Sequence, residues 1–336
     1  MIVFDEKVNK DTISAWDSFA AQYGRGRVAM FDLETTGLTP RSSFIYIIGI
    51  NLYMDGEWHI LQLFNDDGRS EPEMIRHFME LLGDKDVLVH FNGDTFDLPF
   101  VRGRIEKIRL QTGEEINDIM SRLGSMDLYK EIKPYKYALG LPNVRQKTVE
   151  LYLGINREDR YNGGQLIDVY LNYLSSGNRR DRDLVLLHNR DDMEGMFHLA
   201  KLHALSTLCG GDYDIREIGI NEKGGVLLLC LKLVTALPLP KELFVSLSGT
   251  SLHGEGNDAV LTLKLSDGEW INKVTRDPER GFFIPQQGYT GLPVYESPED
   301  KKCTAVSAGD SLLGDPDRLK AYSLCCIQKL LKQKKG

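Results

Sequence analysis

The sequence predicts a mixed α/β sheet flanked by helices, followed by a smaller β-rich region that ends in a helix. Three observations predict this fold class. A two-residue hairpin signal, Asp55-Gly56, links two early strands; later strand signals alternate with helix signals; and strand signals dominate after residue 208. Hairpin-linked strands are antiparallel and strands joined by helices are usually parallel, so we expect both pairings in one sheet.

Strands are expected where short apolar runs are bounded by turn residues. Asp55-Gly56 is a strong signal for a two-residue hairpin, and Asn92-Gly93 ends a short, buried-looking strand. The expected strands cover residues 27–35, 44–54, 57–65 and 86–91, and strand followed by helix signals recur at 125–132 and 144–153.

Helices are expected where apolar residues recur every three or four positions. Ser70 and Glu73 form a capping-box pattern before one such run, and Pro99 suits the first turn of a helix that starts near Leu98. The other expected helices cover residues 8–23, 164–176 and 182–207.

The character of the chain changes near residue 208. The segment Cys-Gly-Gly-Asp-Tyr-Asp is typical of a linker, Asp267-Gly268 indicates a turn between strands, and Asp315 with Pro316 opens a final helix. We therefore expect a helical extension over 1–24, the sheet domain over 25–207 and a β-rich accessory region over 208–336.

Composition excludes several classes of protein. The five cysteines form no C-x-x-C pair, the longest apolar stretch is too short to span a bilayer, and the N-terminus lacks a signal-peptide pattern. We expect a cytoplasmic protein without a membrane partner. A nucleotide cofactor is not expected, because the glycine run Gly249–Gly256 has Glu255 where a phosphate-binding loop needs lysine. The net charge of −8 argues against a broadly basic surface, although cations bound by carboxylates would reverse the charge locally.

The most informative run is Phe-Asp-Leu-Glu-Thr-Thr-Gly at residues 31–37. Asp32 and Glu34 lie two apart at the end of a strand, so both carboxylates point to one face of the sheet. Two close carboxylates repel each other unless a cation lies between them, and a divalent cation prefers such hard oxygen ligands. The alternative is an acid-rich strand end that enters a turn.

Two later segments carry side chains that suit the same site. Asp97 stands at the start of a helix, where a carboxylate also serves as an ordinary cap. His188 and Asp192 are four residues apart on one helix face, beside apolar neighbours that point this face into the fold. A metal would partner such a pair, and the alternative is a His–Asp hydrogen bond that ties two elements together. Asp127 is interpreted as structural.

Taken together, Asp-x-Glu, Asn-x-x-x-Phe-Asp and His-x-x-x-Asp occur in an order that resembles the DEDD superfamily of 3′–5′ exonucleases. The likeness covers about residues 25–207. It is closer to the YprB-type branch, because it extends to Val149–Ile155 and to His188-Asn189-Arg190. The resemblance implies a ribonuclease-H-like fold and two divalent metal ions, Mg²⁺ or Mn²⁺. The resemblance also implies that the metal ligands are Asp32, Glu34, Asp97 and Asp192.

The resemblance also implies that His188 orients the attacking water. The superfamily's tyrosine form has three residues between tyrosine and aspartate, and its histidine form has four; here the spacing is three but the residue is histidine. Asp192 is preferred to Asp191 as the ligand, because Asp191 is rotated by roughly 100° from the His188 face.

The expected function is a metal-dependent 3′–5′ exonuclease that acts on single-stranded or frayed DNA or RNA. The alternative is a catalytically weak or inactive nucleic-acid-binding module that keeps the ribonuclease-H-like fold. Thr35, Asn92 and Phe96 are candidate substrate contacts, with Phe96 either stacking on a base or packing in the core. The sequence assigns no role to residues 208–336 and no protein partner.

Overall fold

A computed structural model describes most of the chain. The described residues are 1–157, 161, 163–285, 287, 289, 291, 294–296, 302–306 and 311–333, without the side chains at 11 and 12. The chain divides into two compact units, one formed by Met1–Glu131 with Asn143–Lys201 and the other by Ile132–Pro142 with Leu202–Gly336.

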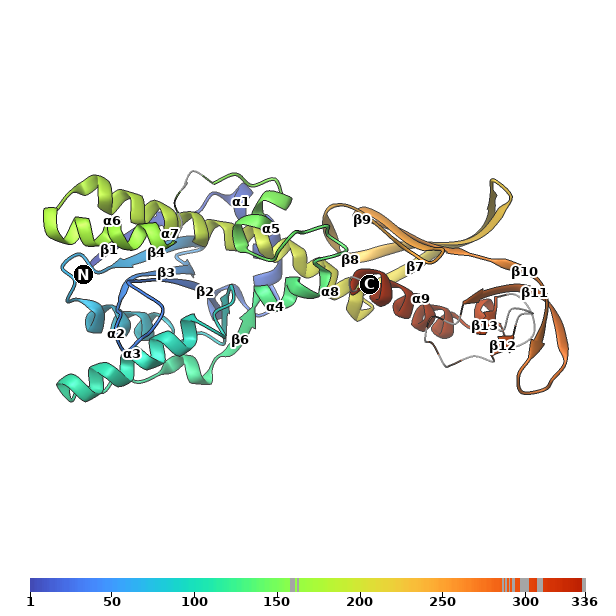
Figure 1. The fold of residues 1–336 in the computed structure, drawn as a ribbon, viewed down its shortest axis with the longest axis horizontal. Coiled ribbons are helices and arrows are strands. Elements are labelled where there is room, and N and C mark those ends of the chain that lie inside the picture. The colour runs from blue at the N-terminus through green and yellow to red at the C-terminus, as the bar shows by residue number, and fades with distance from the viewer. Residues whose placement is uncertain are drawn as a thin grey trace. The chain divides into compact units, whose positions relative to one another are not determined.

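The first unit is built on a six-stranded mixed sheet with the strand order β1-β4-β3-β2-β5-β6 (Figure 1). The first four strands in this order pair antiparallel, whereas β2–β5 and β5–β6 pair parallel. The expected mixed sheet is therefore confirmed. Its strands are β1 (Ile2–Lys7), β2 (Val28–Thr35), β3 (Ile45–Met54), β4 (Glu57–Phe64), β5 (Val87–His90) and β6 (Gly124–Asp127).

Two turns of this sheet depend on left-handed backbone. Asp55 has φ 51° and Gly56 has φ 84° between β3 and β4, which is the backbone of the predicted two-residue hairpin. Asn92 has φ 63° directly after β5, a conformation that asparagine tolerates better than most residues. One strand differs from the expectation: Ile2–Lys7 falls in the segment expected to be helical, but it pairs with β4 as an edge strand.

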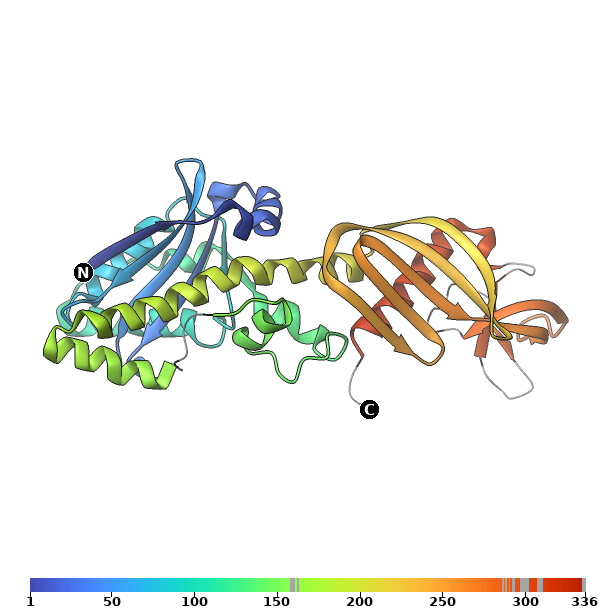
Figure 2. The same cartoon turned by 90° about the horizontal axis from the view of Figure 1, so that it is seen from above.

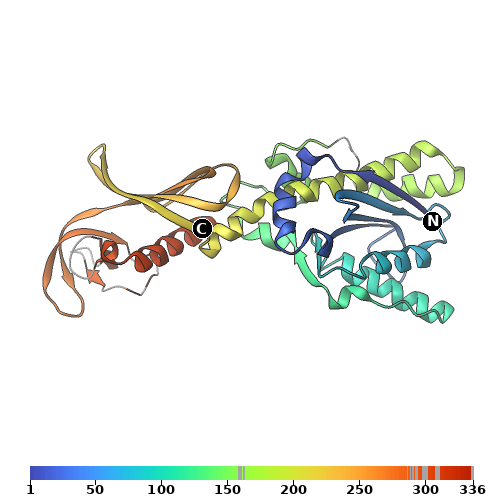
Figure 3. The same ribbon diagram turned by 180° about the vertical axis from the view of Figure 1, so that it is seen from behind.

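Helices cover both faces of the sheet (Figures 1 and 3). On one side lie α6 (Gly163–Ser176) and α7 (Arg179–Leu199), and on the other lie α2 (Glu71–Leu81) and α3 (Asp97–Thr112). The remaining helices of this unit are α1 (Lys10–Ala21), α4 (Leu128–Ile132), whose last residue belongs to the second unit, and α5 (Gln146–Tyr152).

The predicted capping box at α2 is wrong, because its hydrogen bonds are not formed. Ser70 stands at the N-cap but makes no side-chain capping bond. Its hydroxyl instead donates to Asp67 Oδ1 at 2.7 Å and accepts from the N-terminal ammonium of Met1 at 2.8 Å. The helix nevertheless begins at the predicted place, because Pro72 occupies its first turn and its apolar face packs on the sheet.

The long helix expected over 182–207 is three segments. Figure 2 shows α7 lying across the sheet, and it is followed by a 3₁₀ turn, Ala200–Leu202, and by α8 (His203–Gly210). The sequence pattern runs through this break without proline or glycine, so no local signal marks it.

The second unit contains a three-stranded antiparallel sheet of β7 (Tyr213–Lys223), β8 (Val226–Leu247) and β9 (Thr250–Lys264). Four shorter strands close into a small barrel: β10 (Ser266–Asn272), β11 (Pro278–Pro285), β12 (Tyr295–Glu296) and β13 (Lys302–Ala305). The predicted turn at Asp267-Gly268 is wrong, because both residues lie within β10 and pair with Phe282 and Gly281.

The final helix, α9 (Pro316–Leu331), is confirmed with its cap. Asp315 accepts from the backbone N–H groups of Asp317 and Arg318. Among the helices of the described residues, none combines the length and the apolar character that a membrane crossing requires.

Candidate metal centre

Strand β2 divides its side chains between the two faces of the sheet. Ala29, Phe31 and Leu33 belong to the core that packs under α2 and α3. Because side chains alternate along a strand, Asp32 and Glu34 point to the opposite face, where α7 lies. The expectation that both carboxylates share one face is confirmed.

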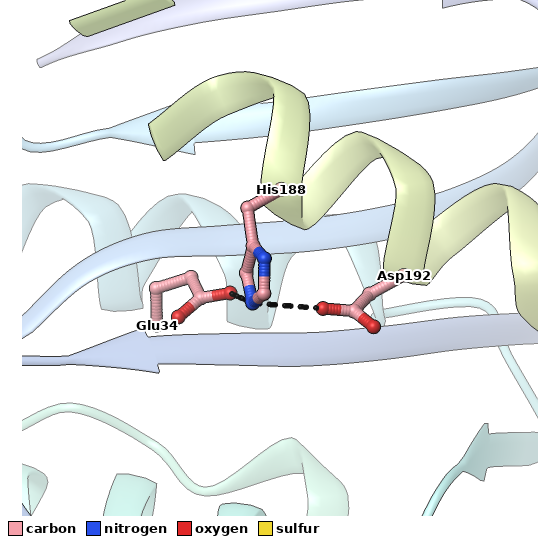
Figure 4. A group of neighbouring side chains, drawn as sticks. All are labelled: Glu34, His188 and Asp192. Carbon is pink, nitrogen blue, oxygen red and sulfur yellow. Dashed lines mark ion pairs between the residues drawn. The ribbon is translucent and has the colours of Figure 1, made fainter. Parts of the chain in front are cut away.

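Figure 4 shows the cluster that α7 completes on this face. His188 Nε2 lies 3.6 Å from Glu34 Oε1 and 3.3 Å from Asp192 Oδ2. The three residues offer ligand atoms that all lie within 4.8 Å of one another, so they could hold a metal ion. Tyr46 donates its hydroxyl to Glu34 Oε2 at 3.3 Å, which leaves Oε1 on the side of His188.

Asp97 reaches the same site from the first residue of α3. The backbone N–H groups of Asp97 and Leu33 donate to its carboxylate, so the side chain is tied to β2 between Asp32 and Glu34. Burial raises the pKa of Asp97 to about 7 against these hydrogen bonds, and the charges of Asp127 and Asp192 add to the rise.

Asp32 is half-buried and lies among the other three carboxylates of the group. Burial raises its pKa well above the usual range, and the charges of Asp192, Asp97 and Glu34 raise it further. Its Oδ2 accepts from Asn189 Nδ2 at 3.2 Å. The four carboxylates therefore act on one another electrostatically, as expected of side chains brought to one site.

A glycine on β3 allows α7 to come this close. Gly49 pairs with Asp32 across the strands, and a Cβ at Gly49 would lie 2.5 Å from Asn189 Oδ1 and 2.7 Å from Met193 Cγ. Gln62 on β4 holds the same amide, because its Nε2 donates to Asn189 Oδ1 at 3.0 Å. The missing side chain at position 49 thus provides the space for the residue that orients Asp32.

Asp192 has a second partner in an arginine from the segment after α5. Arg157 Nη2 lies 2.6 Å from Asp192 Oδ1, while Oδ2 faces His188. Asp191 does not belong to the trio around His188; its Oδ1 lies 3.8 Å from Arg190 Nη1. The geometry agrees with the preference for Asp192 over Asp191.

The three candidate substrate contacts have partners within the protein. Thr35 Oγ1 donates to the Gly37 carbonyl at 2.9 Å at the end of β2. Asn92 Oδ1 accepts from Thr95 Oγ1 at 3.0 Å, and half-buried Phe96 packs against the core with its ring centroid 5.4 Å from that of Phe100. Of the two readings of Phe96, the packed one describes this geometry.

A second acidic group, formed by His90, Asp94 and Asp127, lies at the ends of β5 and β6. Lys130 Nζ is 2.5 Å from Asp94 Oδ2, and Asp127 Oδ1 accepts the backbone N–H groups of Asn92 and Tyr129. These donors are committed to holding the loop after β5, which agrees with a structural role for Asp127.

Sequence reasoning missed the residues that support the carboxylates. It assigned no role to Asn189 beyond the resemblance, and it did not single out Gln62, Arg157 or Gln146. The available signals were Gly49 in a central strand and Gly195 in a helix, since neither is favoured there without a packing reason. Such a glycine indicates a close approach but does not identify the side chain that makes it.

The residues present fit a divalent metal ion. Three segments bring carboxylate oxygens and one imidazole nitrogen to a buried site, and hard oxygen ligands of this kind suit Mg²⁺ or Mn²⁺. Arg157 supplies positive charge at its edge, and buried carboxylates at this density otherwise repel one another.

The strand order and the acidic centre at β2, α3 and α7 define a ribonuclease-H-like α/β domain. The model of the RNase H superfamily matches residues 29–204. The chain belongs to this superfamily.

The curated relatives of this chain include DNA polymerases. The chain is 39% identical over 87 residues to a DNA polymerase of Pyrococcus glycovorans, which covers 24% of this chain and 11% of the polymerase. It is 25% identical over 159 residues to DNA polymerase 1 of Sulfurisphaera ohwakuensis, which covers 40% and 18%. The matched part is thus under a fifth of each of these polymerases.

Solved structures with a similar arrangement include two nucleic-acid enzymes. The family B DNA polymerase from Pyrobaculum calidifontis matches with TM-score 0.47 and 12% identity, over 91% of this chain and 46% of that chain. E. coli Exonuclease I in complex with a dT13 oligonucleotide matches with TM-score 0.31 and 13% identity, over 62% and 54%.

The raised carboxylate pKa values predict that the metal-free protein loses stability as the pH rises. The folded state holds protons on Asp97, with its pKa of about 7, and on Asp32, whereas the unfolded chain has released both above about pH 4. The stabilisation is therefore lost as the pH rises through 7. Thermal melting in EDTA should give a lower midpoint at pH 7.5 than at pH 6.5, and Mn²⁺ should reverse this order.

Two histidines with lowered pKa values do not contribute to the change between pH 6.5 and 7.5. Burial lowers the pKa of His90 and lowers that of His198 to about 4, so below about pH 6.5 the unfolded chain binds protons on them more readily than the folded state does. Asp97→Asn is the matched control and should flatten the slope. An unchanged slope in this variant would contradict the assignment.

Proposed function

We propose that this protein is a metal-dependent 3′–5′ exonuclease that hydrolyses phosphodiester bonds with two divalent metal ions. The observation that carries the proposal is the convergence of Asp32, Glu34, Asp97 and Asp192 with His188 on one face of the sheet. The proposal includes membership of the DEDD group and of its YprB-type branch.

In this mechanism the four carboxylates would hold the metal ions. When bound, two such ions would activate water and stabilise the departing 3′ oxygen of an in-line displacement. Asp32 and Glu34 would supply ligand oxygens from β2, and Asp97 and Asp192 would supply them from α3 and α7. The tie between Asp97 and the Leu33 N–H, and that between Asp32 and Asn189, hold the ligands in place before substrate arrives.

In this proposal His188 accepts or orients the proton of the attacking water. Its Nε2 lies between Glu34 Oε1 and Asp192 Oδ2, at the centre of the carboxylate group. A water that donates to this nitrogen is held beside the ligands, and imidazole accepts a proton near neutral pH. The i, i+4 spacing from Asp192 fixes the ring above the site.

Nucleic acid is the proposed substrate. The relatives are named as DNA polymerases, which favours a polynucleotide. Thr35, Asn92 and Phe96 remain proposed contacts to the terminal nucleotide, and their present partners would have to be exchanged or shared when it binds.

A binding module without activity is less favoured. Four neighbouring carboxylates that hold no metal cost stability, as the raised pKa values of Asp32 and Asp97 indicate. A protein that kept only the fold would gain by replacing them with neutral side chains.

Matched single-stranded DNA and RNA oligonucleotides, each labelled at the 3′ end, test the proposal. The protein should release labelled mononucleotide in Mn²⁺ or Mg²⁺ and none in EDTA, and the ratio of the two rates gives the preferred sugar. If neither oligonucleotide is cut with any divalent metal, the proposed activity is wrong.

Replacing His188 tests its separate role. His188→Ala should lower kcat by about a hundredfold or more, since a positioned general base contributes at least this much. His188→Tyr should retain more activity than His188→Ala, because the spacing to Asp192 is that of the tyrosine form. Mn²⁺ affinity, measured without substrate, should change little in the tyrosine variant. Equal activity of the alanine variant and the unaltered protein would exclude the role.

A further inference from the structure

Among the described residues of the first unit, two ion pairs between arginine and glutamate are buried. In each pair the arginine uses Nε and Nη2 on the two oxygens of the glutamate. Arg104 and Glu71 have side chains that are both 7% exposed, and those of Arg157 and Glu150 are 7% and 1% exposed. Replacing such pairs by apolar residues is often neutral or stabilising, so stability alone does not explain why either pair is present.

The pair at Arg104 is complete. Its Nη1 donates to the Pro40 carbonyl at 2.6 Å, while Nε and Nη2 bind Glu71. Glu71 Oε1 also accepts the backbone N–H of Ile45 at 2.8 Å. Each guanidinium nitrogen is satisfied, and the pair ties α2 and α3 to the chain before β3.

The pair at Arg157 is incomplete. Nη2 bridges Glu150 Oε1 at 2.7 Å and Asp192 Oδ1 at 2.6 Å, and Nε binds Glu150 Oε2. Nη1 is buried and has no hydrogen-bond partner among the described residues. An unpaired buried donor destabilises the folded state, and more so on a charged group.

The surroundings hold Arg157 in this position. Gln146 on α5 donates from Nε2 to Glu150 Oε1 at 3.0 Å and to the Asp192 carbonyl at 2.7 Å. Gly195 on α7 gives Glu150 its space, because a Cβ there would overlap Glu150 Oε1. A glycine inside a helix is less stable than an alanine there, so α7 loses some helix stability where it admits this carboxylate.

The position of Arg157 suggests a role for its unpaired donor, Nη1. Its guanidinium contacts Asp192, so its charge acts on the carboxylate centre. Among the described residues no acceptor satisfies Nη1, whereas a nucleic-acid substrate brings an anion. A phosphodiester has two non-bridging oxygens, and metal ions engage only part of this charge.

We propose that Arg157, clamped by Glu150, donates from Nη1 to a non-bridging oxygen of the scissile phosphate and is a catalytic residue. The inference rests on the proposed function and adds a substrate contact to it. Arginine suits this task because its fork binds carboxylate and phosphate in a fixed geometry, which lysine does not reproduce.

Stereodefined phosphorothioate oligonucleotides test the contact. Sulfur in place of the oxygen that Arg157 binds should slow cleavage in Mn²⁺ by about tenfold in the unaltered protein. The test variant combines Arg157→Met with Glu150→Gln, so that Glu150 is not left as an unpaired buried charge. It should cleave the normal substrate about a hundredfold more slowly and should cut the phosphorothioate at nearly the same rate as the normal substrate.

The matched control is the complete pair, replaced in the same way as Arg104→Met with Glu71→Gln. It should keep both the rate and the tenfold effect of sulfur. If the test variant does not fold, Arg157→Lys serves in its place, because lysine keeps the charge beside Glu150 but lacks Nη1; it should also lose the effect of sulfur.

Mn²⁺ affinity measured by electron paramagnetic resonance without substrate separates this role from simple support of Asp192. It should change by less than about threefold in Arg157→Lys. Persistence of the sulfur effect in the variants, or a tenfold loss of Mn²⁺ affinity with that effect intact, would overturn the inference. Failure of the proposed function has a different signature, because the unaltered protein would then cleave neither substrate.

Discussion

Asp32→Asn should reduce hydrolysis by at least about a thousandfold, because a ligand of the metal centre contributes several kcal/mol of transition-state stabilisation. Asparagine keeps the shape of the side chain and can still accept from Asn189, so the fold should persist. Asp191→Asn is the matched control. It lies on α7 beside the proposed ligand Asp192, outside the trio around His188, and should retain most of the activity.

Asp32→Asn should also stabilise the metal-free protein. Burial and the charges of Asp192, Asp97 and Glu34 raise the pKa of Asp32, so ionising this group disfavours the folded state. A neutral amide removes that cost. In EDTA at pH 8, Asp32→Asn should therefore melt at a higher temperature than the unaltered protein, while Mn²⁺ should raise its melting midpoint less. A variant that is less stable in EDTA, or that remains active, would refute the assignment.

Gly49→Ala should both destabilise the first unit and disable the site. The new Cβ would meet Asn189 Oδ1 at 2.5 Å and Met193 Cγ at 2.7 Å, so α7 would have to move away from β3. Overpacking of this kind costs about 1–3 kcal/mol, against a gain of roughly 0.5–1 kcal/mol from replacing glycine in a strand. Urea unfolding should show a net loss of stability of about 1–2 kcal/mol.

The activity loss in Gly49→Ala should exceed what the stability loss explains. Asn189 holds Asp32, and α7 carries His188 and Asp192, so a shift of the helix separates ligands that must act together. Gly124→Ala on β6 is the control, because the nearest atom to its Cβ is 3.5 Å away. It should be neutral in stability and activity. Full activity of Gly49→Ala would show that α7 does not need this approach.

The sheet could be predicted because its signals are local. The apolar runs that form its strands end at Asp55-Gly56 and Asn92-Gly93. Residues of these types tolerate the left-handed backbone that both turns adopt. Ile2–Lys7 could not be assigned in this way, since half of it is charged and its partner β4 supplies the pairing. Asp267-Gly268 has turn composition, but pairing with β11 keeps it extended.

The carboxylates were found for the same reason. Two-residue spacing on a strand and four-residue spacing on a helix determine which side chains share a face. Arg157 and Glu150 have no such spacing relative to Asp192, because the chain fold brings α5 and the segment after it against α7. Their part in the site became visible only through the hydrogen bonds and through Gly195, whose missing side chain leaves room for Glu150.

The direction and metal dependence of cleavage test the central claim most directly. A single-stranded oligonucleotide labelled at its 5′ end should be shortened by one nucleotide at a time from the 3′ end in Mn²⁺, and the ladder should vanish in EDTA and in Asp32→Asn. Labelled fragments that come from internal cleavage, release of the 5′ label as mononucleotide at the outset, or an intact strand with every divalent metal would contradict it.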